Sequence, residues 1–245
     1  EYLKSCLLSP QAKKLLLALL LIQQNEEDRW AKDGRLKVNE FRPYIDVEKF
    51  RELGFASRTK SSRFLRKPIS ELTATMGIFD ELVISENGRF VRWQFAGRFL
   101  KNFWNKDMSI DKEKYGLIDD WQIGLCNRKY DSILLAQIAV HSGMNYPQFR
   151  IFSAHKTHSN EFPSMQTPYY PSQLKRQILP SLQVLADKVH KTFAVIFERS
   201  LSSPEFVDVQ IRIRDEKSKW TNGRFHSQPR RSEFCLIIPN ISGVN

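Results

Sequence analysis

The stretch that decides the fold is residues 57–95, SRTKSSRFLRKPISELTATMGIFDELVISENGRFVRWQF. Its first part has apolar residues at helical spacing and no acid before Glu71, which predicts an amphipathic helix with a cationic face. Two runs rich in β-branched and aromatic residues then flank Asn87-Gly88, the pattern of a β-hairpin. Residues 46–54, DVEKFRELG, predict a preceding helix that Asp46 caps. A helix, a tight turn, a basic helix and a hairpin together make a winged helix.

The second half of the chain repeats this order. Residues 173–189, QLKRQILPSLQVLADKV, predict a basic helix, and TFAVIFERS and FVDVQIRIRD after it predict another hairpin. Alignment of the two basic stretches in sequence matches Pro68 with Pro180. We expect Pro180 to kink its helix because proline lacks a backbone N–H. The predicted fold is α+β. It consists of two tandem winged-helix domains, 1–108 and 109–245, each with a basic recognition helix followed by a β-hairpin wing.

The remaining segments carry weaker signals. Ser9-Pro10 before a long apolar run predicts the start of a central core helix. We predict a short strand at 36–38, one helix over 119–143 and a long loop over 143–171. Residues 234–239, FCLIIP, are typical of either a strand or a docking tail.

The composition indicates an acidic partner. The 245 residues include 38 Lys and Arg against 27 Asp and Glu, a net charge of +11, and 41% apolar residues permit a normal core. Such a cationic excess favours nucleic acid as the partner. The longest apolar run, 15–22, is well short of the roughly 20 residues that cross a bilayer, so we expect no membrane partner. Three cysteines without a CxxC pair are typical of a reduced cytoplasmic protein.

Candidate DNA contacts follow from charge and hydrogen-bonding capacity, because Arg and Lys bind phosphates and guanine edges, and hydroxyls and amides donate to phosphates. In the first half they are Arg58, Lys60, Ser61, Arg63, Arg66 and Lys67 of the basic helix and Arg89 and Arg92 of the hairpin. In the second half they are Tyr169, Tyr170, Ser172, Gln173, Lys175 and Arg176 around the helix start and Arg199 before the second turn. The competing interpretation is that these side chains form ordinary solvated charged faces.

No enzymatic motif accompanies these residues. His155 and His158 have no further ligand at metal-binding spacing, and no phosphate-binding GxxxxGK[ST] loop occurs. Tyr169-Tyr170 is similar to the tyrosine nucleophile of nicking enzymes, but the metal-binding histidine pair of those enzymes is missing. We therefore predict a binding protein that is not an enzyme, with no catalytic residue, metal or cofactor.

Three stretches carry a family resemblance. LSPQAKKLLLALLLIQQN (8–25), LKRQILPSL (174–182) and KTFAVIFE (191–198) resemble the first helix, the second recognition helix and the following strand of iteron-binding plasmid replication initiators (Rep proteins). The resemblance implies a cytoplasmic protein that binds double-stranded direct repeats of about 20 base pairs, two successive major-groove faces, at a plasmid origin. It also implies origin opening, recruitment of the host replication initiator, helicase and replisome proteins, and homodimers that serve copy control.

Other functions are compatible with the same residues. A tandem winged-helix transcriptional regulator without an origin role is the main alternative. A metal-dependent nickase or nuclease and an RNA-binding or protein-interaction role are further alternatives.

Overall fold

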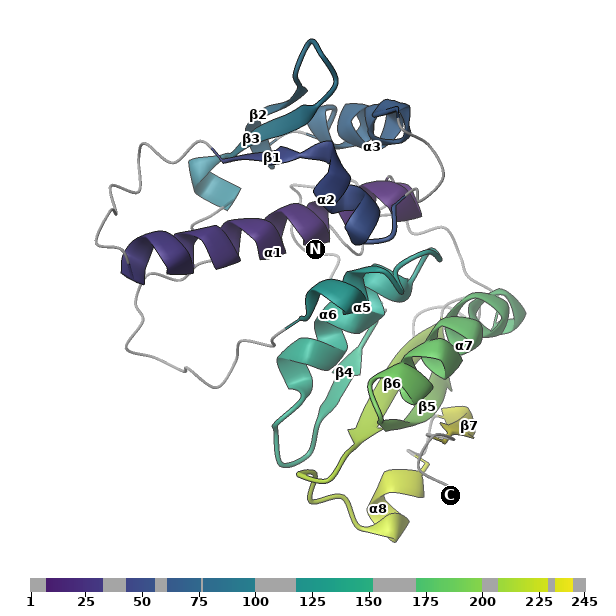
Figure 1. The fold of residues 1–245 in the computed structure, drawn as a ribbon. Coiled ribbons are helices and arrows are strands. Elements are labelled where there is room, and N and C mark those ends of the chain that lie inside the picture. Colours follow the sequence, from purple (N-terminus) through teal and green to yellow (C-terminus); the bar gives the residue numbers. More distant parts are fainter. Residues whose placement is uncertain are drawn as a thin grey trace. The chain divides into compact units, whose positions relative to one another are not determined.

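The computed structural model describes residues 8–32, 43–55, 61–75, 77–99, 118–151, 171–199, 207–228 and 232–239 (Figure 1). The fold is α+β, as predicted, and it divides into two compact units. The described residues up to Asn127 form unit 1 and those from Arg128 form unit 2. The predicted boundary at 108/109 falls outside the described residues, but residues 118–127 belong to unit 1 and not to the second domain.

Unit 1 places helices against a small antiparallel sheet. Its helices are α1 (Pro10–Lys32), α2 (Val47–Glu52), α3 (Arg63–Thr73) and α5 (Asp120–Ile123), and its strands are β1 (Tyr44–Asp46), β2 (Phe79–Ile84) and β3 (Phe90–Phe95). The strand order is β1-β3-β2, so β3 is central. The predicted hairpin over residues 78–95 is therefore confirmed. The strand predicted at 36–38 lies outside the described residues, and the short strand before α2 is β1.

The first helix is the core of unit 1, as its apolar sequence predicts. Leu15, Leu16 and Leu19 are buried, and α1 packs against α3. Ser9 caps the helix, because its Oγ accepts a hydrogen bond from the Ala12 N–H at 3.2 Å. The Asp46 carboxylate caps α2 in the same way by accepting from the Glu48 N–H at 2.8 Å.

The prediction of a single helix over 119–143 is wrong, because two helices from different units occupy this segment. After α5, residues 124–130 form turns before α6 (Asp131–His141) begins unit 2. Several contacts attach α5 and the turn after it to unit 1. The Asp120 carboxylate accepts a hydrogen bond from Lys49 Nζ at 2.9 Å, which raises the pKa of Lys49 above its ordinary value. The buried Lys14 donates to the Gly54 carbonyl at 2.9 Å and to Asn127 Oδ1 at 3.3 Å.

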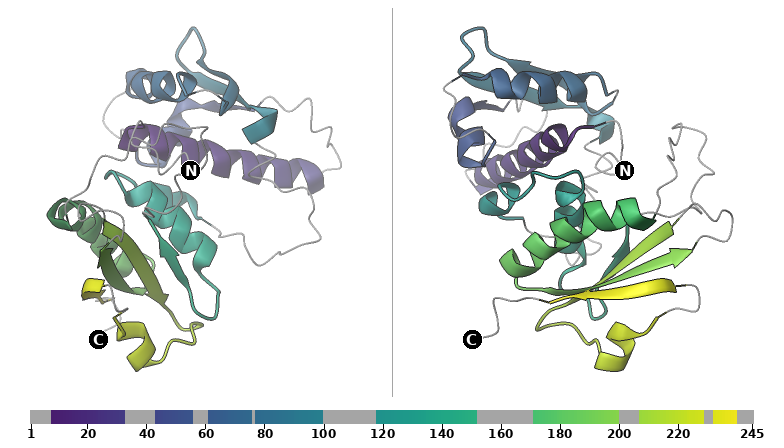
Figure 2. Two further views of the ribbon diagram at one scale, coloured as in Figure 1. Left: turned by 180° about the vertical axis from the view of Figure 1, so that it is seen from behind. Right: turned by 90° about the vertical axis from the view of Figure 1, so that its right-hand side faces the viewer.

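Unit 2 has a four-stranded antiparallel sheet with α7 across one face (Figure 2). After α6 come β4 (Gln148–Arg150), α7 (Pro171–Lys188), β5 (Thr192–Arg199), β6 (Val207–Arg214), α8 (Asn222–His226) and β7 (Ser232–Ile238). The strand order is β4-β6-β5-β7. The predicted second hairpin, β5 and β6, is confirmed. Residues 234–238 of FCLIIP belong to a strand, β7, and β4 lies within the segment predicted as a loop.

The two units share one topology. In each, a helix (α1 or α6) precedes a three-residue strand, and a later helix (α3 or α7) is followed by a hairpin whose second strand pairs with the short strand. The helix α2, directly before α3, has no counterpart among the described residues of unit 2. Unit 2 extends this plan with α8 and β7. The predicted order of basic helix and hairpin therefore recurs in both units, but α6 corresponds to α1 by its place before the short strand and not to α2.

The pattern of buried residues corrects the residue-by-residue match between α3 and α7. The buried residues of α3 are Leu65, Pro68, Ile69 and Leu72, and the buried set in the described part of α7 is Ile178, Ser181, Leu182 and Leu185, together with Ala186 at its end. The two sets of four have the same spacing only if Leu65 is matched with Ile178. The alignment of Pro68 with Pro180 is therefore wrong by one residue, because contact with the core and not the position of the proline fixes the rotation of each helix. In the corrected register Arg63 matches Arg176.

The helix α7 is assigned as one element from Pro171 to Lys188, with Pro180 at an exposed position inside it. Arg128 Nη1 donates to the Pro180 carbonyl at 2.8 Å, and Ser181 Oγ donates to the Gln177 carbonyl at 3.3 Å. The kink that the sequence predicts at Pro180 stays a prediction.

A buried arginine holds α8 on unit 2. Nη1 of Arg212 donates to the carbonyl oxygens of Arg224, Phe225 and Ser227 at 2.6, 3.0 and 2.9 Å, and the guanidinium lies 5.3 Å from the ring centroid of Trp220. Burial lowers the pKa of Arg212 from its ordinary value, and burial raises the pKa of the Cys235 thiol. Arg212 thus supplies hydrogen-bond donors that the carbonyls at the end of α8 lack within the helix.

Replacing Arg212 with alanine is expected to lower the free energy of unfolding by about 2–3 kcal/mol, because three carbonyls lose a charged donor. Urea denaturation followed by circular dichroism measures the change. The control is Arg224→Ala, because Arg224 lies on the same helix with an exposed side chain and should change stability by less than about 0.5 kcal/mol. Equal losses in the two variants would contradict this role of Arg212.

Candidate nucleic-acid interface

The helix α3 presents one apolar and one cationic face. Its buried residues face α1 and β2, which fixes the rotation of the helix, while Arg63, Arg66, Lys67 and Ser70 are exposed. Arg63, Arg66 and Ser70 are three and four residues apart and so share one side of the helix. The predicted amphipathic helix is confirmed between residues 63 and 73, while Arg58 and Lys60 lie outside the described residues.

The three cations of α3 have no acidic partners among the described residues. Within the part of the chain that the structure describes, no carboxylate lies within ion-pairing distance of Arg63, Arg66 or Lys67. On the neighbouring α2, by contrast, Lys49 pairs with Glu52 and Asp120. An uncompensated cationic cluster on one rigid helix attracts anions and costs little desolvation when a phosphate binds.

Ser61 and Ser62 lie at the start of this face. Ser61 Oγ accepts a hydrogen bond from the Arg63 N–H at 3.2 Å, and Ser62 occupies the cap position of α3. Ser62 also lies against the hairpin turn, because a Cβ at Gly88 would come within 2.9 Å of its Oγ. Gly88 has a φ of +68°, so glycine satisfies both the turn and the close approach.

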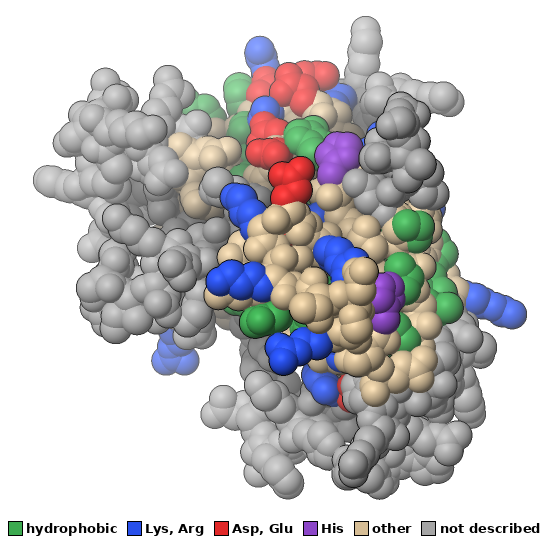
Figure 3. Space-filling view, turned by 90° about the horizontal axis from the view of Figure 1, so that it is seen from below, with side chains coloured by type: hydrophobic (Ala, Val, Ile, Leu, Met, Phe, Trp, Pro, Cys, Tyr) green, Lys and Arg blue, Asp and Glu red, His purple; other side chains and the backbone are tan. Residues whose placement is uncertain are grey.

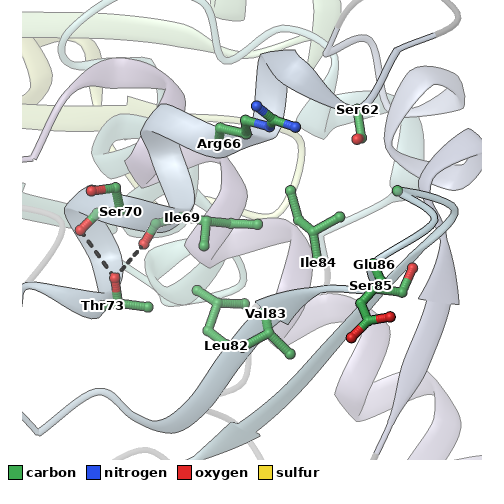
Figure 4. A pocket seen from close by; sticks show the side chains of 11 residues that line it. Ser62, Arg66, Ile69, Ser70, Thr73, Leu82, Val83, Ile84, Ser85 and Glu86 are labelled. Carbon is green, nitrogen blue, oxygen red and sulfur yellow. Dashed lines mark hydrogen bonds between the residues drawn. The ribbon is translucent and has the colours of Figure 1, made fainter.

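A hollow of about 450 Å³ separates α3 from β2 and the hairpin turn (Figure 4). Ser62, Arg66, Ser70 and Thr73 line it on the helix side, and residues 82–86 and Gly88 line it on the hairpin side. Figure 4 shows Ile69 of α3 near Ile84 and Leu82, so the hollow has an apolar floor below a polar rim. The sequence analysis did not identify Ser62, Ser70 and Thr73, although their spacing from Arg66 marks the same helix face.

The hairpin arginines are exposed but paired. Arg89 lies 3.5 Å from the Asp46 carboxylate, and Arg92 Nε donates to Glu81 Oε1 at 2.7 Å across the hairpin. Each arginine would have to share or leave its carboxylate to bind a phosphate. Their predicted DNA contacts stay predictions, with a cost that the α3 cations do not have.

The second predicted helix is described only in part. Arg176 is exposed on α7, and among the described residues no carboxylate pairs with it. Ser172, Gln173 and Lys175 belong to the first turns of α7 and Arg199 ends β5, but their side chains lie outside the described part of the structure, as do Tyr169 and Tyr170 altogether. The structure therefore brings together the α3 candidates and leaves the α7 set represented by Arg176.

One further face provides a comparison. In the view of Figure 3, Lys and Arg side chains are scattered among polar ones and form no continuous patch among the residues drawn in colour. Acidic side chains gather at one side of that view. The helix α3 differs from this view because three cations without an acidic partner among the described residues lie on one helix.

The described residues contain no group of three or more His, Cys, Asp or Glu side chains that could hold a metal ion. His155 and His158 lie outside them. Of the helices in the described ranges, none combines the length and apolar character that crossing a membrane requires. Comparison with protein-family models, with curated proteins and with solved structures gives no match.

Proposed function

We propose that this chain is a sequence-specific double-stranded DNA-binding protein that initiates plasmid replication at direct repeats. Each unit is proposed to be a winged helix, with α3 and α7 as recognition helices and the hairpins β2–β3 and β5–β6 as wings. The observation that carries the proposal is the cationic face of α3, where Arg63, Arg66 and Lys67 have no acidic partner among the described residues. Such a helix suits the major groove, where Arg reads guanine and both residues bind phosphates.

The repeated topology extends the proposal to two grooves. Arg63 of α3 and Arg176 of α7 occupy matching, exposed positions, which supports the same kind of contact by both units. The resemblance to iteron-binding initiators supports the remaining elements: an origin with direct repeats, self-association in copy control, and the host initiator, helicase and replisome proteins as partners. No enzymatic step is proposed.

The footprint on DNA tests this proposal. After selection of a bound sequence from random duplexes, protection from hydroxyl radicals is expected over about 20 base pairs, two turns of the duplex, because each helix occupies one major-groove face. Replacing both Lys175 and Arg176 with alanine should shorten the footprint to about one turn. Protection confined to one turn in the unmodified protein would contradict binding by two units.

The same selection separates the initiator from the transcriptional regulator. An initiator should select a site that recurs as direct repeats beside its own gene, whereas a regulator should select a site at promoters. Steep loss of affinity with salt is expected for both, because several phosphates are neutralised. A shallow salt dependence would contradict either form of DNA binding.

A further inference from the structure

The strand β2 has an open edge in the described structure. Because the order is β1-β3-β2, β2 pairs with β3 on one side, and no described strand pairs with its other side. Edge strands leave backbone N–H and C=O groups available to another chain, and proteins usually cover or charge them. This edge borders the hollow beneath α3.

The register identifies the backbone groups on that edge. The Ser85 N–H, directly after β2, donates to the Phe90 carbonyl at 2.9 Å, and the Phe90 N–H donates to Ser85 Oγ at 2.9 Å, so the backbone N–H of Ser85 and the backbone groups of Phe90 are directed at each other across the hairpin. Bonded and non-bonded pairs alternate in antiparallel sheets, and Ile84 lies opposite Val91. The N–H and C=O of Ile84 therefore point away from β3, and those of Leu82 do the same.

The pairing of β3 with β1 supports this assignment independently. The Val47 N–H donates to the Arg89 carbonyl at 2.9 Å, and the Trp93 N–H donates to the Pro43 carbonyl at 3.3 Å. Odd-numbered residues of β3 thus direct their backbone groups toward β1. Val91 is among them, so it cannot also bond to Ile84.

These edge residues line the hollow. Leu82 and Ile84 form its strand side, and Arg66, Ser70 and Thr73 overlook it from α3 (Figure 4). A strand adds to a sheet at a spacing of about 4.8 Å and directs alternate side chains to opposite faces. An extended chain beside β2 would therefore present every second side chain to the polar stripe of α3.

The chemistry of the hollow favours a peptide over a phosphodiester. The edge presents carbonyl oxygens as well as N–H groups, and carbonyl oxygens repel a phosphate. The floor also includes the apolar Ile69 side chain, which has neither a charge nor a hydrogen-bond donor for an anion. A peptide backbone matches both kinds of edge group, as in other cases of strand addition beside a helix.

Charge specifies the peptide. Arg66 lies on the rim of the hollow, Arg63 and Lys67 flank it on α3, and none has an acidic partner among the described residues. Glu86 places one negative charge at the hairpin-turn end. We propose that the groove between α3 and β2 binds an extended acidic segment of a partner protein, which adds to β2 as a further strand and turns alternate carboxylates toward Arg66.

Peptide binding does not require DNA binding, and the two ligands compete because both use α3. Fluorescent, capped peptides in which valine alternates with aspartate, serine or lysine are the probes. Measured by anisotropy with the full chain and without DNA, the aspartate peptide should bind at least about tenfold more tightly than the lysine peptide, because like charges repel at Arg66. The serine peptide should lie between them.

Backbone pairing is tested by N-methylation of the aspartate peptide, which leaves the protein unchanged. Methylation of the alternate amides that face β2 should weaken binding by up to about tenfold per N–H removed, and methylation of the other amides should have little effect. In the protein, Ile84→Pro removes one outward N–H without removing a hydrogen bond between β2 and β3. It should weaken peptide binding and leave DNA binding unchanged. Arg66→Glu should strongly weaken binding of the aspartate peptide. The charge-matched control is Arg98→Glu, at an exposed position that does not line the hollow.

Three results would overturn the proposal. One is a peptide affinity that depends only on the net charges of peptide and protein. In that case Arg66→Glu and Arg98→Glu would weaken peptide binding equally, and N-methylation of the peptide would have no effect. The second is slower amide exchange at Leu82 and Ile84 with duplex DNA but not with peptide. The third is the same slowing with rising protein concentration alone, which would make a second copy the occupant. Because the peptide experiments contain no DNA, their failure leaves the DNA-binding proposal standing, and loss of the DNA footprint would leave peptide binding standing.

Discussion

Replacing Arg63, Arg66 and Lys67 together with alanine is expected to weaken binding to the selected duplex by about 3–4 kcal/mol, a factor of several hundred, at ~150 mM salt. The estimate combines a base contact with phosphate contacts, since base contacts contribute about 1–3 kcal/mol each and phosphate contacts less. All three side chains are exposed, and alanine favours helix, so α3 should remain folded. Titration by fluorescence anisotropy gives the Kd.

The control removes the same charge elsewhere. The triple variant Arg98→Ala, Lys217→Ala and Lys219→Ala also lowers the net charge by three, and all three side chains are exposed outside α3 and α7. It should lose only the long-range attraction, a loss of less than about tenfold that salt abolishes. If both triple variants lose affinity equally, the net charge of the protein and not the α3 face governs binding.

The largest effect on stability is expected from Trp93→Ala. Trp93 is fully buried in unit 1, and its Nε1 donates to Gln23 Oε1 of α1 at 3.0 Å. Truncation leaves a cavity and removes this donor, so the free energy of unfolding should fall by about 3–5 kcal/mol. Urea denaturation gives the value, and hydrogen exchange should show lost protection in β2 and β3 but not in β5 and β6.

Trp121 provides the matched control within the same unit. Its side chain on α5 is 51% exposed, so Trp121→Ala should cost far less, within about 1 kcal/mol. Comparable losses for the two tryptophans would show that Trp93 does not anchor the sheet to α1.

Local patterns in the sequence predict much of this fold. The alternation of Val91, Trp93 and Phe95 with polar residues and the Asn87-Gly88 turn identify the first hairpin, because strand alternation and turn chemistry are properties of neighbouring residues. The caps Ser9 and Asp46 are equally local. The strands β1 and β4 have three residues each, too few for a periodic pattern, so their positions do not follow from the sequence.

Long-range features account for the errors. The match of Pro68 with Pro180 rests on residue types alone. The rotation of each helix, by contrast, depends on contacts with core residues that are distant in the sequence. The Arg92–Glu81 pair depends on hairpin register, and the hollow depends on how α3 lies over an edge strand. The exposed face of α3 was predictable because it follows from the helical period alone, while the apolar floor below it was not.

The docking of α5 has a consequence for how the chain can be divided. A fragment ending near residue 108, where the composition changes, would lack the Asp120 partner of Lys49 and the Asn127 partner of the buried Lys14. It would also uncover the backbone of Gly54, where Gly124 lies close enough to leave little space for a side chain. A fragment that keeps these contacts of unit 1 therefore has to extend through Asn127.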